Sequence, residues 1–125
     1  MSGPRIVIVE EDAVARNALA GYFLAQGWLV TAVGTTAEGL MCLDPLPDCV
    51  LLDLMQPGRG GELLLWKVRS EKLPVRVVVT SASCDSERAN AVMSLSPEAF
   101  LKKPVDAATV YRACQGGPEV TGRSG

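Results

Sequence analysis

The chain has 125 residues, of which 48% are hydrophobic and 21% are charged, and its formal net charge is −2. This size and composition suit one globular domain with a packed core, and the weakly acidic balance gives no electrostatic reason to expect nucleic-acid binding. The chain contains no histidine, which excludes a Ser-His-Asp triad, a histidine-ligated zinc or haem site and a phosphohistidine carrier within it.

The first half of the chain alternates short β-branched runs with segments of helical periodicity. Arg5–Val9 reads RIVIV, an unbroken apolar run that predicts a strand buried on both faces of a parallel sheet. Ala13–Gln26 repeats apolar residues at helical spacing, with Asp12 to cap its start and Gly27 to end it. Three elements follow in order: a strand at Trp28–Val33, a short helix from Thr35 or Thr36 to about Leu43, and a strand at Cys49–Leu52 that ends at Asp53.

The second half repeats this alternation. After a loop at Gln56–Gly61, the expected elements are a helix at Glu62–Ser70, a strand at Val75–Thr80, a helix from Asp85 or Ser86 to about Leu95, a strand at Ala99–Lys102 and a helix at Asp106–Cys114. This order predicts an α/β fold: a doubly wound, flavodoxin-like sheet of five parallel strands in the order 2-1-3-4-5, with five helices in a three-layer α/β/α sandwich. We expect the domain to span residues 1–114, and residues 115–125 to form a flexible tail or linker.

The four cysteines form no metal or redox motif, because Cys42, Cys49, Cys84 and Cys114 are far apart and include no Cys-x-x-Cys pair. We expect reduced, packed thiols. The first residues lack a signal-peptide pattern, and no apolar run approaches the length of a membrane span. We therefore expect a cytoplasmic chain that does not contact a membrane.

Polar side chains end the predicted strands at the edge of the sheet where their carboxyl ends meet. They are Glu10, Glu11 and Asp12 after the first strand, Asp53 after the third, Thr80 and Ser81 at the fourth, and Lys103 at the fifth. Carboxylates held this close repel one another, and a hard divalent cation such as Mg²⁺ relieves the repulsion. With a carboxylate nucleophile, a lysine and a hydroxyl also present, the pattern favours a site that accepts a phosphoryl group.

Four segments of the chain resemble the receiver domain of bacterial two-component response regulators, over about residues 5–114. They are IVIVEED (Ile6–Asp12) with Arg16, PDCVLLDLMQPGRGGEL (Pro47–Leu63), VVVTSA (Val77–Ala82) and AFLKKP (Ala99–Pro104). Each segment alone is a weak signal, but the four in this order and on these elements are highly specific.

The resemblance implies a phosphoryl-transfer chemistry for the strand-end residues. Asp53 would accept a phosphoryl group from a sensor histidine kinase or a histidine phosphotransfer protein. Mg²⁺, with Mn²⁺ as a substitute, would be held by Glu10, Glu11, Asp53 and the backbone carbonyl of Met55. Asp12 would join these ligands only if the turn shifts by one residue.

The resemblance also implies a conformational switch rather than an enzyme. Thr80 corresponds to the switch hydroxyl, Lys103 to the lysine that pairs with the phosphoryl group, and Phe100 to an aromatic that changes rotamer. The peptide bond before Pro104 is expected to be cis. Partners, or a second copy in a homodimer, would bind the face formed by the fourth helix, the fifth strand and the fifth helix.

Departures from the family pattern carry their own expectations. Glu11 stands where the family usually has aspartate, and its extra methylene disturbs the near-octahedral geometry of Mg²⁺. This feature favours the alternative function, a phosphorylation-independent pseudo-receiver that acts as an interaction module. Met55 and Ala82 offer no acid or amide to orient a water, so we expect slow autodephosphorylation. Met55 also argues against an aspartate-nucleophile phosphatase, which has a second aspartate at that position. The segment Leu95-Ser96-Pro97 predicts a shortened fourth helix.

Overall fold

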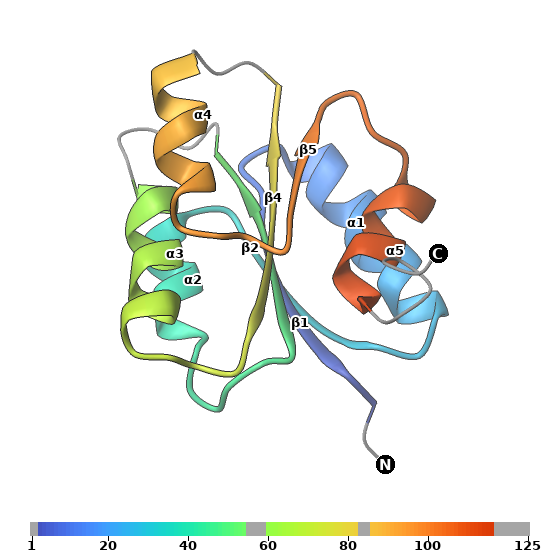
Figure 1. The fold of residues 1–125 in the computed structure, drawn as a ribbon. Helices are drawn as coiled ribbons and strands as arrows, with labels where there is room; N and C mark the ends of the chain where they lie inside the picture. Colours follow the sequence, from blue (N-terminus) through green and yellow to red (C-terminus); the bar gives the residue numbers. More distant parts are fainter. Residues whose placement is uncertain (1–2, 55–59, 83–85, 117–125) are drawn as a thin grey trace.

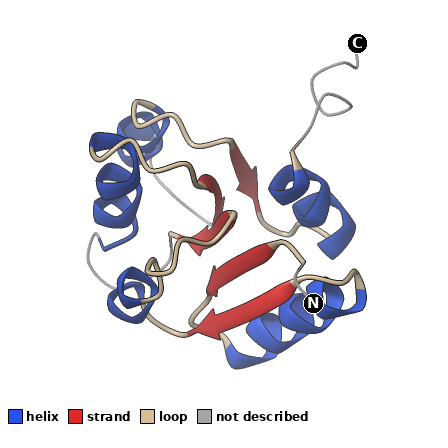
Figure 2. Cartoon of the chain, turned by 90° about the horizontal axis from the view of Figure 1, so that it is seen from below, coloured by secondary structure: helices blue, strands red, loops and turns tan. Residues whose placement is uncertain are grey.

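The structure, a computed structural model, describes residues 3–54, 60–82 and 86–116. It is a three-layer sandwich around a parallel five-stranded sheet in the order β2-β1-β3-β4-β5 (Figure 1). Helices α1 and α5 cover one face of the sheet, and α2, α3 and α4 cover the other (Figure 2). The predicted fold class and strand order are confirmed.

The elements alternate along the chain as the sequence predicts. The strands are β1 (Arg5–Val9), β2 (Leu29–Val33), β3 (Cys49–Asp53), β4 (Arg76–Ser81) and β5 (Ala99–Lys102). The helices are α1 (Ala13–Ala25), α2 (Thr36–Met41), α3 (Gly60–Ser70), α4 (Ser86–Met93) and α5 (Ala107–Gln115). All four residues of β1 from Ile6 to Val9 and all of β3 are buried, as expected for strands with helices on both sides.

Helix α3 begins earlier than predicted. It starts at Gly60, inside the segment expected to be a loop, because two glycines let its first turn pack closely against its neighbours. A Cβ on Gly61 would lie 2.9 Å from Cδ2 of Leu54, and one on Gly60 would lie 3.0 Å from Cβ of Thr36. These two glycines therefore serve helix packing rather than a turn.

Helix α4 is short, as the sequence Leu95-Ser96-Pro97 predicts. It ends at Met93, two residues before the expected boundary, and Ser96 adopts a left-handed backbone conformation with φ of 55°. The guanidinium of Arg69 on α3 donates to the carbonyl oxygens of Leu95 and Ser96, at 3.2 and 2.7 Å respectively. These bonds satisfy carbonyl groups that a longer helix would have paired internally.

Two hydrophobic clusters fill the spaces between the layers. In the cluster under α1 and α5, the ring of Phe23 lies 5.3 Å from the rings of both Trp28 and Tyr111, and the Trp28 indole donates to the Tyr111 hydroxyl at 3.2 Å. The described cysteines Cys42, Cys49 and Cys114 are free thiols, and Cys84 lies outside the described residues.

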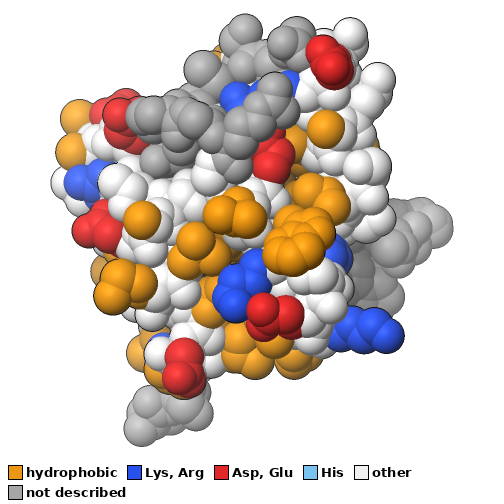
Figure 3. Space-filling model, turned by 90° about the vertical axis from the view of Figure 1, so that its left-hand side faces the viewer, with side chains coloured by type: hydrophobic (Ala, Val, Ile, Leu, Met, Phe, Trp, Pro, Cys, Tyr) orange, Lys and Arg blue, Asp and Glu red, His pale blue; other side chains and the backbone are white. Residues whose placement is uncertain are grey.

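Several large apolar side chains remain on the surface over the second face of the sheet (Figure 3). Those on α2, α3 and α4 that are more than half exposed are Met41, Leu63, Trp66 and Met93. Within the described residues, no helix combines the length and the apolar character that a bilayer span requires.

Candidate functional site

Sheet register brings the predicted site residues to one edge. Asp53, the last residue of β3, is the register partner of Thr80 on β4. Two backbone bonds extend this alignment past the strand ends: the N–H of Leu54 donates to the Thr80 carbonyl, and the N–H of Lys103 donates to the Ser81 carbonyl, each at 2.9 Å. Backbone pairing therefore fixes the positions of the Cα atoms from which these side chains extend.

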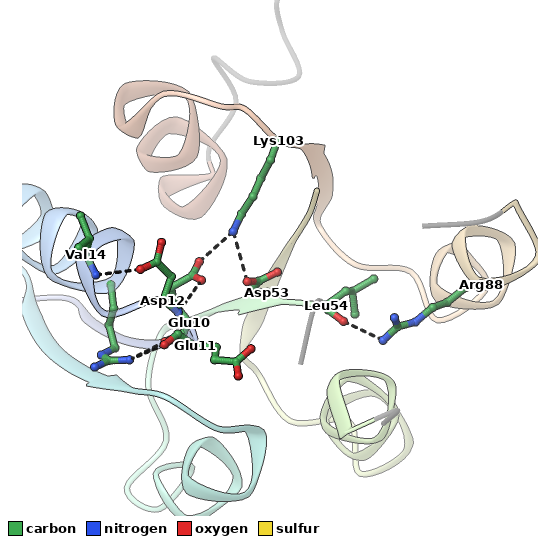
Figure 4. A network of polar contacts seen from close by, with 9 residues as sticks. Glu10, Glu11, Asp12, Val14, Asp53, Leu54, Arg88 and Lys103 are labelled. Carbon is green, nitrogen blue, oxygen red and sulfur yellow. Dashed lines mark hydrogen bonds and ion pairs between the residues drawn. The ribbon is translucent and has the colours of Figure 1, made fainter. Parts of the chain in front are cut away.

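A lysine joins two buried carboxylates at the centre of the site (Figure 4). Lys103 Nζ donates to Glu10 Oε1 at 3.1 Å and to Asp53 Oδ2 at 3.2 Å. Both carboxylate residues are 3% exposed. Lys103 thus meets Glu10, which is 93 positions away in the chain, and Asp53, which is 50 positions away, in one charged cluster.

The cluster alters the protonation of its members. Burial and a hydrogen bond with the Asp53 carboxyl raise the pKa of Glu10, although Lys103 opposes that shift. Burial by itself would lower the pKa of Lys103, but the hydrogen bond to Glu10 and the charges of both carboxylates outweigh burial and raise that pKa. Lys103 is therefore charged at neutral pH, and the two carboxylates share its single positive charge.

The turn after β1 separates the roles of the three consecutive acids. Arg16 Nη1 donates to the backbone carbonyls of Glu10 and Glu11, at 2.8 and 3.2 Å, which holds the turn in one register. The Asp12 carboxylate caps α1 through the N–H of Val14 at 3.1 Å, and the backbone N–H of Asp12 donates to Glu10 Oε2 at 3.2 Å. Glu10 thus lies at the buried centre, Glu11 is exposed at its rim, and Asp12 serves the helix.

A cavity of about 550 Å³ opens beside this cluster. Its polar wall includes Glu10, Asp12, Thr80 and Lys103. Its apolar wall comes from α1 and α5 and from Ala82, Pro104 and Val105. The Thr80 residue is buried, at 4% exposure, and reaches the same space as Lys103. A ligand in the cavity would meet a hydroxyl, an ammonium and carboxylates together.

The structure describes three of the remaining predicted positions, Phe100, Pro104 and Ala82. Phe100 on β5 is partly buried and packs against the core under α2, α3 and α4. The Lys103–Pro104 peptide bond is cis. Ala82 is exposed and lines the cavity. Met55 lies outside the described residues.

The donor set fits a hard divalent cation. Glu10 and Asp53 offer oxygen ligands, and one ammonium offsets only part of their combined charge. In the part of the chain that the structure describes, no three acidic or thiol side chains converge as a metal site. A cation here would also need backbone carbonyl and water ligands, which is how Mg²⁺ is usually bound.

One contact at this edge was not anticipated from the sequence. Arg88 on α4 donates through Nη2 to the backbone carbonyl of Leu54 at 2.8 Å (Figure 4). It also forms an ion pair with Glu62 on α3. These partners are 34 and 26 positions away from Arg88, and no motif or spacing relates them.

Comparisons with known proteins agree on the family. The family model of the response regulator receiver domain matches residues 6–115. The transcriptional regulatory protein CseB of Streptomyces coelicolor is 32% identical over 106 residues, covering 84% of this chain and 45% of that protein. The chain spans less than half the length of such curated relatives, as it does for the transcriptional activator protein PfeR of Pseudomonas aeruginosa, at 33%.

Solved structures share the fold. A CheY-like response regulator receiver domain protein from Methanospirillum hungatei matches with a TM-score of 0.85 and 20% identity, covering 99% of this chain and 100% of that chain. A response regulator protein from Burkholderia pseudomallei, solved with a phosphorylated aspartic acid, a calcium ion and citrate, matches with a TM-score of 0.80 and 17% identity, covering 97% and 72% of the two chains.

Proposed function

This chain belongs to the response regulator receiver domain family, and we propose that it accepts a phosphoryl group on Asp53 and passes the signal on by changing shape. The observation that carries the proposal is the bridge from Lys103 to Glu10 and Asp53 at the carboxyl edge of the sheet. It joins a nucleophilic carboxylate to a cation able to hold a phosphoryl oxygen, in reach of a cavity.

A phosphohistidine donor must lie outside these 125 residues, because they contain no histidine. An oxygen of the Asp53 carboxylate attacks the phosphorus of a phosphohistidine on a sensor kinase or phosphotransfer protein. The O–P bond forms while the P–N bond breaks, and the electron pair returns to the imidazole nitrogen, which takes up a proton. The product is an acyl phosphate on Asp53, with Lys103 paired to one of its phosphoryl oxygens.

Glu10 and Asp53 would hold Mg²⁺, with Mn²⁺ as a substitute, together with the two ligands that the family resemblance implies, Glu11 and the Met55 carbonyl. Glu11 lies at the rim and does not converge with the other two acids in the described residues. When bound, the cation neutralises charge on the transferring phosphoryl group. The residues of this chain set the conditions for that binding: Arg16 holds the acidic turn, and Glu10 and Asp53 supply buried charge. Glu11, at the rim, has a longer side chain than the aspartate usual in the family, and it would therefore be the weaker ligand of the site.

The acyl phosphate would draw Thr80 and Lys103 inward, and Phe100 would repack behind Thr80. This is a shift between two populations of conformers, in which the face of α4, β5 and α5 changes. A downstream partner or a second copy would read that face. We assign the receiver to residues 1–115, one residue beyond the predicted boundary at 114 because α5 ends at Gln115. We assign the residues that follow to a tail or linker, and we place the reaction in the cytoplasm.

Intact mass spectrometry after incubation with acetyl phosphate and Mg²⁺ tests the proposal. The wild-type chain should gain the mass of one phosphoryl group, and Asp53→Asn should gain none. The variant is isosteric, which keeps its fold comparable with the wild type. Undiminished labelling of Asp53→Asn would contradict the assignment, and an unlabelled wild type would favour the phosphorylation-independent interaction module.

A further inference from the structure

Helix α4 contributes little to the hydrophobic core, and polar side-chain contacts hold it to the rest of the domain. Within Ser86–Met93, all of which the structure describes, Val92 is the one buried residue. Two arginines reach across the boundary between α3 and α4. Arg69 on α3 binds the carbonyls that follow α4, and Arg88 on α4 binds Glu62 on α3.

The Arg88 contact is geometrically demanding. Its Nε and Nη2 donate to the two carboxylate oxygens of Glu62, at 2.7 and 3.0 Å, and Nη2 also donates to the Leu54 carbonyl at 2.8 Å. The two side chains are only 18% and 13% exposed, so solvent screens the pair weakly. A planar guanidinium can meet both partners at once, whereas a lysine ammonium lacks the fork that does so.

The third bond leads directly to the phosphoacceptor. Leu54 follows Asp53, and its N–H is bound to the Thr80 carbonyl at 2.9 Å. Its carbonyl is bound by Arg88. The residue after Asp53 is therefore held by β4 on one side and by α4 on the other, and any movement of this segment must be accommodated by Arg88.

We propose that Arg88 is a positioning residue that couples α4 to the phosphoacceptor segment through the Leu54 carbonyl. This inference rests on the proposed function. Arg88 transmits the displacement that phosphorylation causes at the end of β3 to the first turn of α4, and Glu62 orients its guanidinium. Without Arg88, Asp53 still accepts the phosphoryl group, but α4 no longer responds.

Arg69→Ala is the matched control. It removes an arginine that also ties the α4 region to α3, yet Arg69 contacts Leu95, Ser96 and Glu98 rather than Leu54. Both variants should loosen α4. Only Arg88→Ala should disconnect it from the site.

The experiment measures hydrogen–deuterium exchange of the peptide that contains Ser86–Met93, with and without acetyl phosphate and Mg²⁺, while intact mass reports labelling of the same sample. In the unphosphorylated state, Arg88→Ala should speed exchange in α4 about tenfold, the effect of losing one net charge-assisted contact. Phosphorylation should change the exchange of α4 in the wild type and in Arg69→Ala. In Arg88→Ala, phosphorylation should change exchange only near Asp53. Arg88→Lys should give an intermediate response.

A wild-type response of α4 in Arg88→Ala would overturn the inference, as would its equal loss in Arg69→Ala. Absent labelling of the wild type is a separate result that overturns the proposed function. In that case the coupling is read from Asp53→Asn, whose effect on exchange in α4 must disappear when Arg88→Ala is added. Persistence of that effect in the double variant would also refute the coupling.

Discussion

Replacing Lys103 by methionine tests the electrostatic account of the site most directly. The substitution keeps the length and the apolar stem of the side chain but removes the ammonium that lies 3.1 Å from Glu10 and 3.2 Å from Asp53. Each contact has a gross Coulomb energy of roughly 5 kcal/mol at an effective dielectric constant of about 20. Desolvation of the three groups cancels most of that attraction.

The net cost follows from exposure. Removing one partner of a fully buried pair costs about 3–5 kcal/mol. The side chain of Lys103 is 28% exposed, so water relieves part of the cost. We expect Lys103→Met to lower the free energy of unfolding by roughly 1–3 kcal/mol at pH 7.5, scaled down from that buried-pair value.

The stability deficit of Lys103→Met should depend on pH, in a direction that the pKa of Glu10 determines. The pKa of Glu10 is already raised in the folded chain, and loss of Lys103 removes a group that lowers it. A group whose folded pKa is raised stabilises the fold at low pH and loses that contribution as the pH rises through the folded pKa. The deficit of Lys103→Met relative to wild type should therefore shrink as the pH is lowered from 7.5 to 5, toward the raised pKa of Glu10.

Urea unfolding followed by tryptophan fluorescence at both pH values measures this difference, with Lys102→Met as the control because Lys102 is exposed. Lys102→Met should be nearly neutral at either pH. A deficit for Lys103→Met that stays the same or grows at pH 5 would refute the reasoning, and so would an equal deficit for Lys102→Met.

The remaining predictions concern the rim, the helices and the product. Glu11→Asp should tighten Mg²⁺ binding, because the shorter side chain suits near-octahedral geometry; an unchanged midpoint in a fluorescence titration would contradict this. Gly21→Ala, with nothing within 4 Å of its Cβ in α1, should stabilise the fold by about 0.5–1 kcal/mol. Gly61→Ala should instead destabilise it, since its Cβ would lie 2.9 Å from Leu54; thermal unfolding of both variants checks the opposite signs. The acyl phosphate on Asp53 should decay slowly in the purified chain, and loss of the label within seconds would argue against a site without a water-orienting group.

The sequence was sufficient for the architecture because the relevant information is local. Unbroken apolar runs such as Arg5–Val9 predict strands buried on both faces, and their alternation with amphipathic segments predicts a parallel sheet. The strand ends then place Asp53, Thr80 and Lys103 at one edge without any knowledge of distances, since parallel strands share a direction. The absent histidine already placed any phosphohistidine donor outside these 125 residues.

Tertiary packing decided what local patterns do not encode. The three acids after β1 look alike in sequence, and only the fold assigns Glu10 to Lys103, Asp12 to the cap of α1 and Glu11 to the rim. Similarly, glycines that suggest a loop lie in α3 because Leu54 and Thr36 leave no room for a Cβ.

The contact of Arg88 with Leu54 is the clearest case. It depends on how far α4 lies from the end of β3, and the packing of the helices on that face of the sheet sets this distance rather than any residue pattern in either segment. Propensity and periodicity act over a few residues. The sequence alone therefore indicated which chemistry the strand ends could perform, and the tertiary structure determined which helix contacts the residue after Asp53, because only packing brings such distant groups within hydrogen-bonding range.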